Sequence, residues 1–345
     1  MPKGSPRSRR SAYRCSLVNA ERRDDRITLR FIAARGEVSS SGTNVAAGRM
    51  LEWIDRAGYA CAVGWSGSYC VTAYVGNVNY TRPVRPGRLV EARARIIHTG
   101  RTSMHVLVTV ATSEMASREF EVAGHCILVF VAIDDNGKSR PVEPWLPRTS
   151  SDVALQRHAE ERIAPRIAIA DEMDRVVYSG AGTAPRTKFR FLAAPADANW
   201  GGNAHGGTVM RWIDEAAFAC AAAWSSSSGV AVYSGGIQFY RPIHIGHIVE
   251  VESRLIRVTR RSMHITTHVR SAPATAPRDL ALTTRCVTIY VDPGPAGGSA
   301  KELRPLLAVS DEDHQLESHA VVLTSLRRQM PTIEIELLDP SDTSR

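Results

Sequence analysis

Residues 53–66 read WIDRAGYACAVGWS, and residues 212–225 read WIDEAAFACAAAWS. The two stretches lie 159 positions apart and share 9 of 14 residues. The same offset relates Arg82-Pro83 to Arg241-Pro242 and Ser103-Met104-His105 to Ser262-Met263-His264. A repeat of this length has the size of a whole domain, because solenoid and propeller repeats span only about 20–50 residues. We therefore predict two tandem domains of the same fold that pair like the halves of a dimer.

Each repeat predicts one buried helix followed by antiparallel strands. In the second repeat, small and apolar residues recur at helical spacings of three and four: Val209, Ile213, Ala216, Ala217, Cys220 and Ala223. The period then changes to two, where Val249, Val251 and Ser253 alternate with Glu250, Glu252 and Arg254. This alternation predicts strands that are buried on one face only. Because helices and strands do not alternate, the fold class is α+β, with the helix lying across one sheet.

These patterns divide the chain into five parts. We expect a basic tail at 1–27, domains at 28–147 and 188–300, a helical linker at 148–187, and a C-terminal helix and tail at 301–345. Ser150-Ser151-Asp152 is the expected helix cap of the linker. Further strands are expected at 103–111, 121–133, 262–270 and 281–291, with hairpin turns at 99–101 and 258–260.

Composition excludes several classes of protein. The chain has 345 residues and 43% apolar residues, enough for two cores. No apolar stretch approaches the ~20 residues of a membrane helix, so we expect no membrane span. Residues 1–26 carry most of the formal charge of +8, and the nearly balanced remainder argues against a nucleic-acid partner.

Two features bear on the compartment. The tail through Ala20 is rich in Arg and Ser and lacks acidic residues, which fits either a solvated extension of a cytoplasmic protein or a transit peptide for the mitochondrial matrix. The cysteines form no CxxC pair and fall in apolar segments. We expect buried, reduced thiols in a reducing compartment, and no metal site, for the following six cysteines: Cys15, Cys61, Cys70, Cys126, Cys220 and Cys286.

The candidate chemistry lies where a glycine-rich loop meets a helix. Residues 199–207 read NWGGNAHGG and lead directly into the helix that carries Asp214. Glycines let a backbone approach a ligand closely, and the N–H groups of a helix start can stabilise a developing oxyanion. The alternative is that the glycines only permit a tight turn. Asp55 and Asp214 lie among small apolar residues, where a carboxylate is costly unless it is functional or hydrogen-bonded to a neighbouring loop.

Together these residues form a combined motif. Asn203-x-His205-Gly206-Gly207, then Asp214-Glu215-Ala216, then Phe239-Tyr240-Arg241-Pro242 resembles the hotdog-fold acyl-CoA thioesterases. The tandem arrangement is similar to the double-hotdog acyl-CoA hydrolases of the brain acyl-CoA hydrolase type. The resemblance covers about 28–135 and 187–292. It implies two tandem hotdog domains, each a long central helix wrapped by an antiparallel β-sheet, and hydrolysis of fatty acyl-CoA to free acid and coenzyme A.

In that family the loop of one hotdog faces the helix acid of the other. The resemblance therefore implies one site built from Asn203, His205 and Gly206 with Asp55, and a second from Asn44 and Ala47 with Asp214. The first matches the family better, because the loop at 44–48 lacks the histidine and one glycine. The Gly206 N–H would polarise the thioester carbonyl, Asn203 would orient water or substrate, and Asp55 would activate water or attack directly.

The resemblance also implies how the substrate and other copies of the chain bind. Coenzyme A is part of the substrate, and neither a metal nor a separate cofactor is implied. Its phosphates would contact residues of the glycine loop, the Arg-Pro motifs and the hairpin turns: Gly207, Arg82, Arg241, Arg101, Ser103, Arg260 and Ser262. A homo-oligomer, as a trimer of double-hotdog chains, is expected. Two other functions stay open at this point, a hotdog-fold enoyl-CoA hydratase or dehydratase and a noncatalytic acyl-CoA-binding protein.

Overall fold

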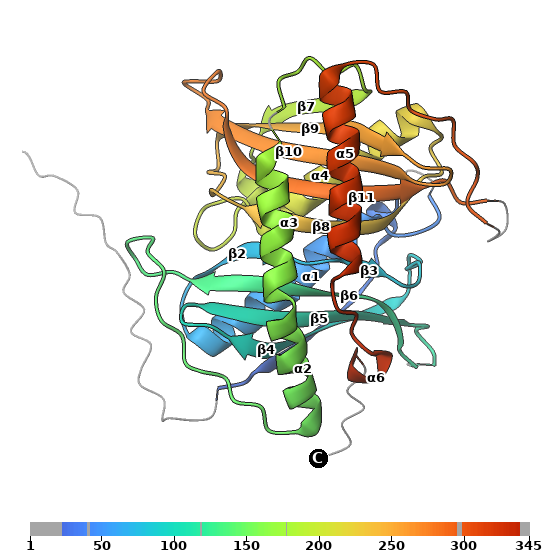
Figure 1. Ribbon diagram of the computed structural model, residues 1–345. Coiled ribbons are helices and arrows are strands. Elements are labelled where there is room, and N and C mark those ends of the chain that lie inside the picture. Colours follow the sequence, from blue (N-terminus) through green and yellow to red (C-terminus); the bar gives the residue numbers. More distant parts are fainter. Residues whose placement is uncertain (1–22, 40–41, 118, 177, 295–298, 339–345) are drawn as a thin grey trace, which may run out of the picture.

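In a computed structural model of the chain, the two repeats build one continuous antiparallel sheet (Figure 1). The structure describes residues 23–39, 42–117, 119–176, 178–294 and 299–338. The sheet has 11 strands in the order β1-β4-β5-β6-β2-β8-β11-β10-β9-β7, with β3 paired to β6 beside this path. The expected tail at 1–27 lies almost wholly outside the described residues.

The first repeat comprises β1 (Arg26–Ile32), α1 (Ala47–Ser66), β2 (Cys70–Val75), β3 (Asn79–Tyr80), β4 (Leu89–Thr99), β5 (Ser103–Ser113) and β6 (Glu121–Ala132). The second comprises β7 (Arg186–Leu192), α4 (Gly206–Trp224), β8 (Val230–Phe239), β9 (His247–Val258), β10 (Met263–Pro273) and β11 (Ala281–Val291). Outside the repeats lie α2 (Ser150–Glu161), α3 (Ile163–Arg175), α5 (Asp311–Arg328) and the short α6 (Ile335–Leu338). Short 3₁₀ turns occupy Arg35–Glu37 and Pro195–Asp197.

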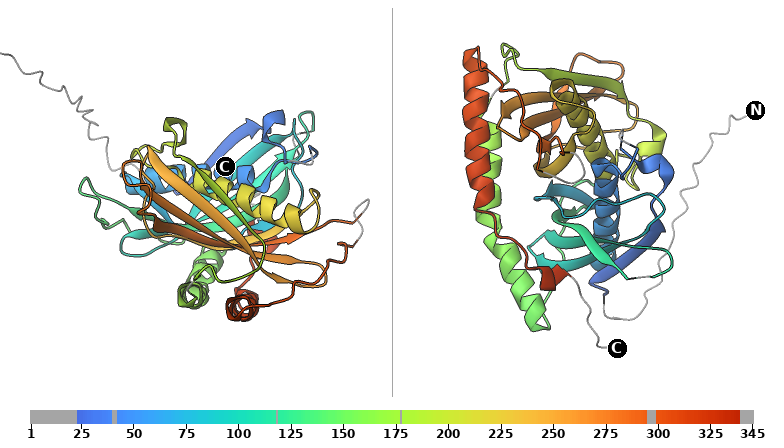
Figure 2. Two further views of the ribbon diagram at one scale, coloured as in Figure 1. Left: turned by 90° about the horizontal axis from the view of Figure 1, so that it is seen from above. Right: turned by 90° about the vertical axis from the view of Figure 1, so that its right-hand side faces the viewer.

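The α+β prediction and the tandem hotdog arrangement are confirmed. Strands β2 and β8 join the two half-sheets through the pairs Tyr74↔Gln238 and Val75↔Ile237. The sheet curves around α1 and α4, which pack against each other on one of its faces, while α2, α3 and α5 cover the other (Figure 2). The outermost strands β1 and β7 begin two residues before the expected domain starts, so the linker ends earlier than predicted.

Small residues let the two central helices lie close together. A Cβ on Gly48 would stand 2.9 Å from the Cα of Arg211, and one on Gly207 would stand 2.8 Å from the Cα of Glu52. Because real Cβ atoms do not approach that closely, both positions require glycine. As a result, the N-terminus of each helix meets the middle of the other helix, which is where Asp55 and Asp214 lie.

One sequence prediction about the strands is wrong. The charged residues that alternate with the core positions are not solvent-exposed: Glu91 is 4%, Glu250 3% and Arg254 4% exposed. Helices α2 and α5 contact β4 and β9 on this outer face. Ion pairs such as Arg254 with Glu312 of α5 make the burial of these charges possible. The two-residue period therefore separated the inner from the outer face of the sheet correctly, but it did not show that helices bury the outer face.

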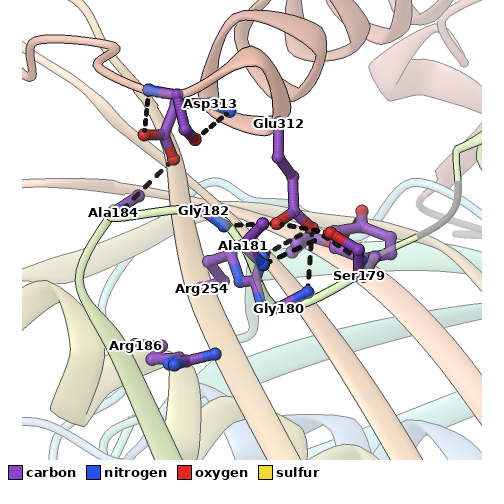
Figure 3. A network of polar contacts seen from close by, with 12 residues as sticks. Ser179, Gly180, Ala181, Gly182, Ala184, Arg186, Arg254, Glu312 and Asp313 are labelled. Atoms are coloured by element: carbon purple, nitrogen blue, oxygen red, sulfur yellow. Dashed lines mark hydrogen bonds and ion pairs between the residues drawn. The ribbon is translucent and has the colours of Figure 1, made fainter.

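Two of the three acids at the start of α5, Glu312 and Asp313, bind the end of the linker (Figure 3). Glu312 accepts the backbone N–H groups of Ser179 (2.8 Å) and Gly180 (3.4 Å), a further N–H from Gly182, and Arg254 at 3.0 Å. Asp313 accepts the N–H of Thr183 at 3.0 Å. These bonds hold the segment before β7 against α5 and complete the outer layer.

The linker is helical, as its pattern predicts, but it forms two helices, α2 and α3, and its cap lies one residue earlier than expected. Thr149 is the N-cap residue of α2 and its hydroxyl accepts the N–H of Asp152 at 3.1 Å. The C-terminal region likewise forms a helix, α5, capped by Ser310.

Five of the six cysteines are buried free thiols, as predicted, and Cys15 lies outside the described residues. None of the helices in the described ranges is long and apolar enough to cross a membrane.

Candidate active site at the domain interface

Asp55 of α1 is the centre of a polar cluster built from both domains. Its carboxylate has no exposed surface. Oδ2 accepts the backbone N–H of Gly207 at 2.7 Å and lies 2.5 Å from Nδ1 of His205. Oδ1 accepts the hydroxyl of Thr72 at 2.8 Å. The structure thus brings Asp55 together with the loop predicted to face it, and adds Thr72 from β2.

The loop holds its shape through one asparagine. Oδ1 of Asn199 accepts the N–H groups of Gly201 (2.9 Å) and Asn203 (3.1 Å), which closes a turn in which Gly202 has φ +77°. The chain then becomes extended at His205, the N-cap residue of α4. Consequently the imidazole leaves the loop beside the first turn of the helix.

Glycine at the helix start is required for this approach. A Cβ on Gly206 would stand 2.9 Å from the hydroxyl oxygen of Thr72 and 3.1 Å from Oδ1 of Asp55. Gly206 is the first residue of α4, so its N–H has no acceptor within the helix and the helix dipole favours negative charge beside it. An N–H in this position can bind a carbonyl oxygen that becomes negative.

Solvent reaches this cluster through the histidine. The side chain of His205 is 21% exposed, whereas that of Asp55 is 0% exposed. Burial lowers the pKa of His205, but the hydrogen bond and charge of Asp55 raise it further, and the net pKa lies above its usual 6.5. The Tyr59 ring packs edge-on at 5.8 Å from the imidazole, and burial together with Tyr69, Cys70 and Asp55 raises the pKa of Tyr59 to about 12. Tyr59 is therefore a neutral wall of the cluster.

The symmetry-related acid, Asp214 of α4, has different partners. Oδ2 accepts the N–H of Gly48 at 2.7 Å, as Asp55 does from Gly207. Oδ1 accepts the hydroxyl of Tyr290 at 2.6 Å. The N-cap residue of α1 is Ala46, so no imidazole is present, and Ala47 stands in the place of Gly206. Burial raises the pKa of Asp214 above its usual value.

The register of the strands explains the exchange of partners. Thr72 pairs with Phe130 across β2 and β6, and Ala231 pairs with Tyr290 across β8 and β11. The first copy thus places a hydroxyl on β2 and a phenyl ring on β6, while the second places a methyl on β8 and a phenol on β11. The phenol hydroxyl of Tyr290 therefore donates to Asp214 in the second copy, as the hydroxyl of Thr72 donates to Asp55 in the first.

The two predicted asparagines, Asn203 and Asn44, lie in the loops that face the acids but, in the described part of the chain, do not bind them through their side chains. Asn203 accepts the N–H of Asn199 at 2.6 Å through its carbonyl, and Asn44 accepts the N–H of Ser39 at 2.7 Å in the same way. Among the described residues, neither side chain hydrogen-bonds to Asp55 or Asp214. The asparagine whose side chain shapes the loop, Asn199, was missed, although it stands in the same glycine-rich stretch.

The predicted coenzyme A contacts do not form one cluster. Gly207 donates its N–H to Asp55 instead of leaving it available. Arg82 pairs with Glu121 at 2.5 Å, and Arg260 pairs with Glu302. Ser262 bonds to Thr259 within its own turn at 2.7 Å. Within the described ranges, the remaining candidates form no hydrogen bond or ion pair with Asp55: Arg101, Ser103 and Arg241.

Thr72 and Tyr290 were also missed from the sequence. Each lies inside an apolar strand, where a hydroxyl residue gives no signal by itself. Alignment of the two repeats offers one, because the copies differ at these positions, Thr72 against Ala231 and Phe130 against Tyr290.

Comparison with known proteins finds one family in both repeats. Residues 42–117 and 201–276 each match the family model described as Thioesterase superfamily. The mouse cytosolic acyl coenzyme A thioester hydrolase is 22% identical over 262 residues, covering 72% of this chain and 68% of that protein. Mouse acyl-coenzyme A thioesterase 11 is 25% identical over 197 residues, covering 53% of this chain. The chain matches only 32% of the length of that relative.

The fold is also found among solved structures. A protein from Lactobacillus plantarum described as an oleoyl thioesterase superimposes with a TM-score of 0.54, covering 77% of this chain and 96% of that one. At 8% sequence identity this likeness bears on the fold alone.

Proposed function

We propose that this chain, which carries two domains of the thioesterase superfamily, hydrolyses the thioester of fatty acyl-CoA to a free acid and coenzyme A. One observation carries the proposal. The buried carboxylate of Asp55 meets the glycine-rich start of α4 from the other domain, which brings a candidate general base next to a helix N-terminus that can hold an oxyanion.

The proposed reaction uses few groups. The thioester carbonyl oxygen binds at the N–H of Gly206, where the helix start stabilises the negative charge that develops on it. Asp55 takes a proton from water as the water oxygen attacks the carbonyl carbon. The C–S bond breaks, and the coenzyme A thiolate leaves and receives that proton. Direct attack by Asp55 through an anhydride is the other route open to the same carboxylate.

Two side chains support Asp55 in this scheme. His205 holds the carboxylate through Nδ1, and Thr72 holds its other oxygen. Asn203 stays our candidate for orienting water or substrate, since within the described chain its side-chain amide makes no hydrogen bond. No metal or separate cofactor enters this scheme.

We propose that the Asp55 site is the productive one. The equivalent region around Asp214 lacks the histidine, has Ala47 in place of Gly206, and has the phenol of Tyr290 bound to the carboxylate. Asn44 and Asp214 are then assigned to a weaker or inactive site.

Coenzyme A binding rests on the resemblance. The arginines with exposed side chains, Arg101 and Arg241, are the candidates best placed to reach phosphates, since Arg82 and Arg260 pair with carboxylates. The ion pairs of Arg82 and Arg260 are exposed and therefore weak, so that a phosphate could displace the carboxylate. Ser103, Ser262 and Gly207 remain secondary candidates.

A panel of acyl-CoA chain lengths, assayed for release of free thiol, tests the proposal. Thiol release with a dependence on Asp55 supports it. Hydration of an enoyl-CoA without thiol release would instead identify a hydratase, and tight binding without turnover would identify an acyl-CoA-binding protein.

We also propose that the chains assemble further, as trimers, in the cytoplasm or, if the tail is a transit peptide, in the mitochondrial matrix. Large apolar side chains remain exposed on the single chain, among them Trp200 at 91%, Leu307 at 75% and Val309 at 73%. Light scattering that shows a strict monomer at micromolar concentration would contradict the assembly. Imaging of a tagged chain with and without residues 1–22 tests the location.

A further inference from the structure

A polar cavity of about 270 Å³ lies on the outer face of the C-terminal half-sheet. Arg186 and Lys188 of β7, Arg254 of β9, and His268 and Arg270 of β10 line it, and Tyr178 closes one side. Figure 3 shows Arg186 and Arg254 beneath the segment Ser179–Gly182 and the start of α5. The volume approaches that of small-molecule sites and far exceeds that of a single water.

The cavity lies on the opposite side of the sheet from Asp55. Its strand residues alternate with Val251 and Val269, which belong to the core beneath α1 and α4. The helix on the cavity's own side is α5, whose Glu312 pairs with Arg254 at 3.0 Å. A ligand in the cavity would therefore not occupy the thioester site.

The charge of the lining favours an anion. Of its four cations, Arg254 pairs with Glu312 of α5. The other three, Arg186, Lys188 and Arg270, face the two carboxylates of the lining, Glu250 and Glu252. The ion pairs of these three cations are long: at their shortest, Lys188 lies 3.4 Å, Arg270 3.5 Å and Arg186 4.0 Å from Glu252. Charge-assisted hydrogen bonds are normally about 2.7–2.9 Å, so these cations retain donor capacity for a ligand.

His268 supplies an independent observation. It is 5% exposed, and its Nε2 has no hydrogen-bond partner among the described residues. The Tyr178 ring packs perpendicular to the imidazole at 4.1 Å and fixes its plane. Burial and the charges of Arg270, Arg285, Arg254 and His319 lower the pKa of His268, so the ring is neutral and Nε2 can carry a hydrogen. A buried polar atom without a partner is costly, and a bound acceptor would remove that cost.

The N-terminal domain lacks this arrangement. The positions that correspond to His268 and Arg270 hold Thr109 and Ala111, both buried at the same places of β5. The fold therefore does not need an imidazole or a guanidinium there. The C-terminal copy carries both, next to a cationic strand, and no step of the proposed hydrolysis uses them.

From this geometry we infer that the cavity binds a phosphate monoester, with Arg186, Lys188 and Arg270 contacting the phosphate oxygens and His268 Nε2 donating to one of them. Guanidinium groups bind phosphate through paired hydrogen bonds, which matches the unused donors of the cavity. The phosphate can come from a free nucleotide or from the 3′-phosphate of coenzyme A, and the test separates these sources.

The experiment is calorimetric titration of the full chain with AMP, adenosine, coenzyme A and 3′-dephospho-coenzyme A. The variant His268→Thr/Arg270→Ala places the residues of the N-terminal copy in the cavity, so that both are compatible with the fold. Arg278→Gln, an exposed arginine in the β10–β11 hairpin, is the matched control for loss of one positive charge. Far-UV circular dichroism and the unliganded melting temperature verify folding.

Wild type should bind AMP or coenzyme A in a phosphate-dependent way, and the double variant should bind that ligand about 10- to 100-fold more weakly. Arg278→Gln should bind as wild type does. If the double variant loses affinity for AMP alone, the ligand is a free nucleotide. If it loses affinity for coenzyme A but not for dephospho-coenzyme A, the cavity binds the 3′-phosphate. Equal affinity for AMP and adenosine together with no difference between coenzyme A and dephospho-coenzyme A would overturn the inference. So would unchanged affinities in the folded double variant.

Should the double variant fail to fold, Arg270→Gln serves in its place, because it removes the positive charge and keeps a polar side chain. The same two outcomes then apply. Because binding is measured and not hydrolysis, the result is independent of the proposed thioesterase activity.

Discussion

Nδ1 of His205 lies 2.5 Å from Oδ2 of Asp55, and the two residues belong to different domains. Neither domain alone holds both the carboxylate and the glycine-rich helix start. The pairing of the two repeats within one chain therefore assembles the candidate site, and it also lets the two symmetry-related sites differ. In a symmetric homodimer of one repeat, Thr72 and Ala231 could not both occur.

Thr72→Val should lower kcat with the fold intact. The hydroxyl of Thr72 donates to Oδ1 of Asp55 at 2.8 Å, and losing a hydrogen bond to a charged group should cost about 10- to 100-fold in rate if this bond positions the carboxylate. Thiol release measures the effect. Thr72→Ser keeps the hydroxyl and should retain most of the activity, and equal losses in both variants would show that the methyl contact matters instead.

His205→Gln should show a pH-dependent loss of stability. Burial lowers the pKa of His205, but the hydrogen bond and the charge of Asp55 raise it by more, so that the net pKa lies above 6.5. The protonated form therefore stabilises the fold. That contribution is fully present below about pH 6.5 and disappears as the pH rises through the raised pKa. The difference in melting temperature between wild type and variant should shrink between pH 6 and pH 9. A difference that is constant over this range would contradict the ion pair.

Tyr290→Phe should destabilise the chain by about 1–3 kcal/mol while leaving kcat nearly unchanged. The phenol donates to the buried Asp214, and its loss removes one of the donors that satisfy this carboxylate. Phe130 occupies the corresponding place in the first copy, so a phenyl ring fits this position of the sheet. Urea unfolding gives the stability and thiol release gives the rate. A large drop in kcat would assign Tyr290 and Asp214 to catalysis.

Glu312→Gln should loosen the outer layer. Glu312 accepts backbone N–H groups of the linker and pairs with Arg254, and although burial raises its pKa, these bonds lower it further, below the usual 4.5. We expect a loss of about 1–2 kcal/mol at pH 7, at the lower end because solvent screens the edge of the network. Because the folded pKa of Glu312 lies below its unfolded value, the difference from wild type is fully present above pH 4.5. It should begin to shrink as the pH falls below 4.5, and it is lost as the pH passes through the lowered folded pKa. Chemical unfolding at pH 7 and pH 4 measures it.

Much of the architecture could be predicted because the sequence contains the same domain pattern twice. The 159-residue offset, the three-and-four spacing of small residues in α4 and the period of two in β9 are local patterns, and local geometry generates them. The pairing of Asp55 with the loop of the other domain came from the family resemblance, and the structure places His205 and Gly207 against Asp55.

The environment of the side chains could not be predicted in the same way. Glu250 and Arg254 have the pattern of an exposed face, but α5, more than fifty residues further on, covers them. Thr72 and Tyr290 acquire partners only through the strand register and the docking of α1 against α4. Such contacts join segments far apart in the chain, and no local period encodes them.

Comparison of Asp55→Asn with Asp214→Asn tests the central claim most directly. Each change removes a charge at the same place of a helix and keeps the size of the side chain, so each is the matched control for the other. With thiol release from a long-chain acyl-CoA as the measure, and circular dichroism as the check on folding, Asp55→Asn should lower kcat by about 10²- to 10⁴-fold and Asp214→Asn far less. Equal losses, or an active Asp55→Asn beside an inactive Asp214→Asn, would contradict the account.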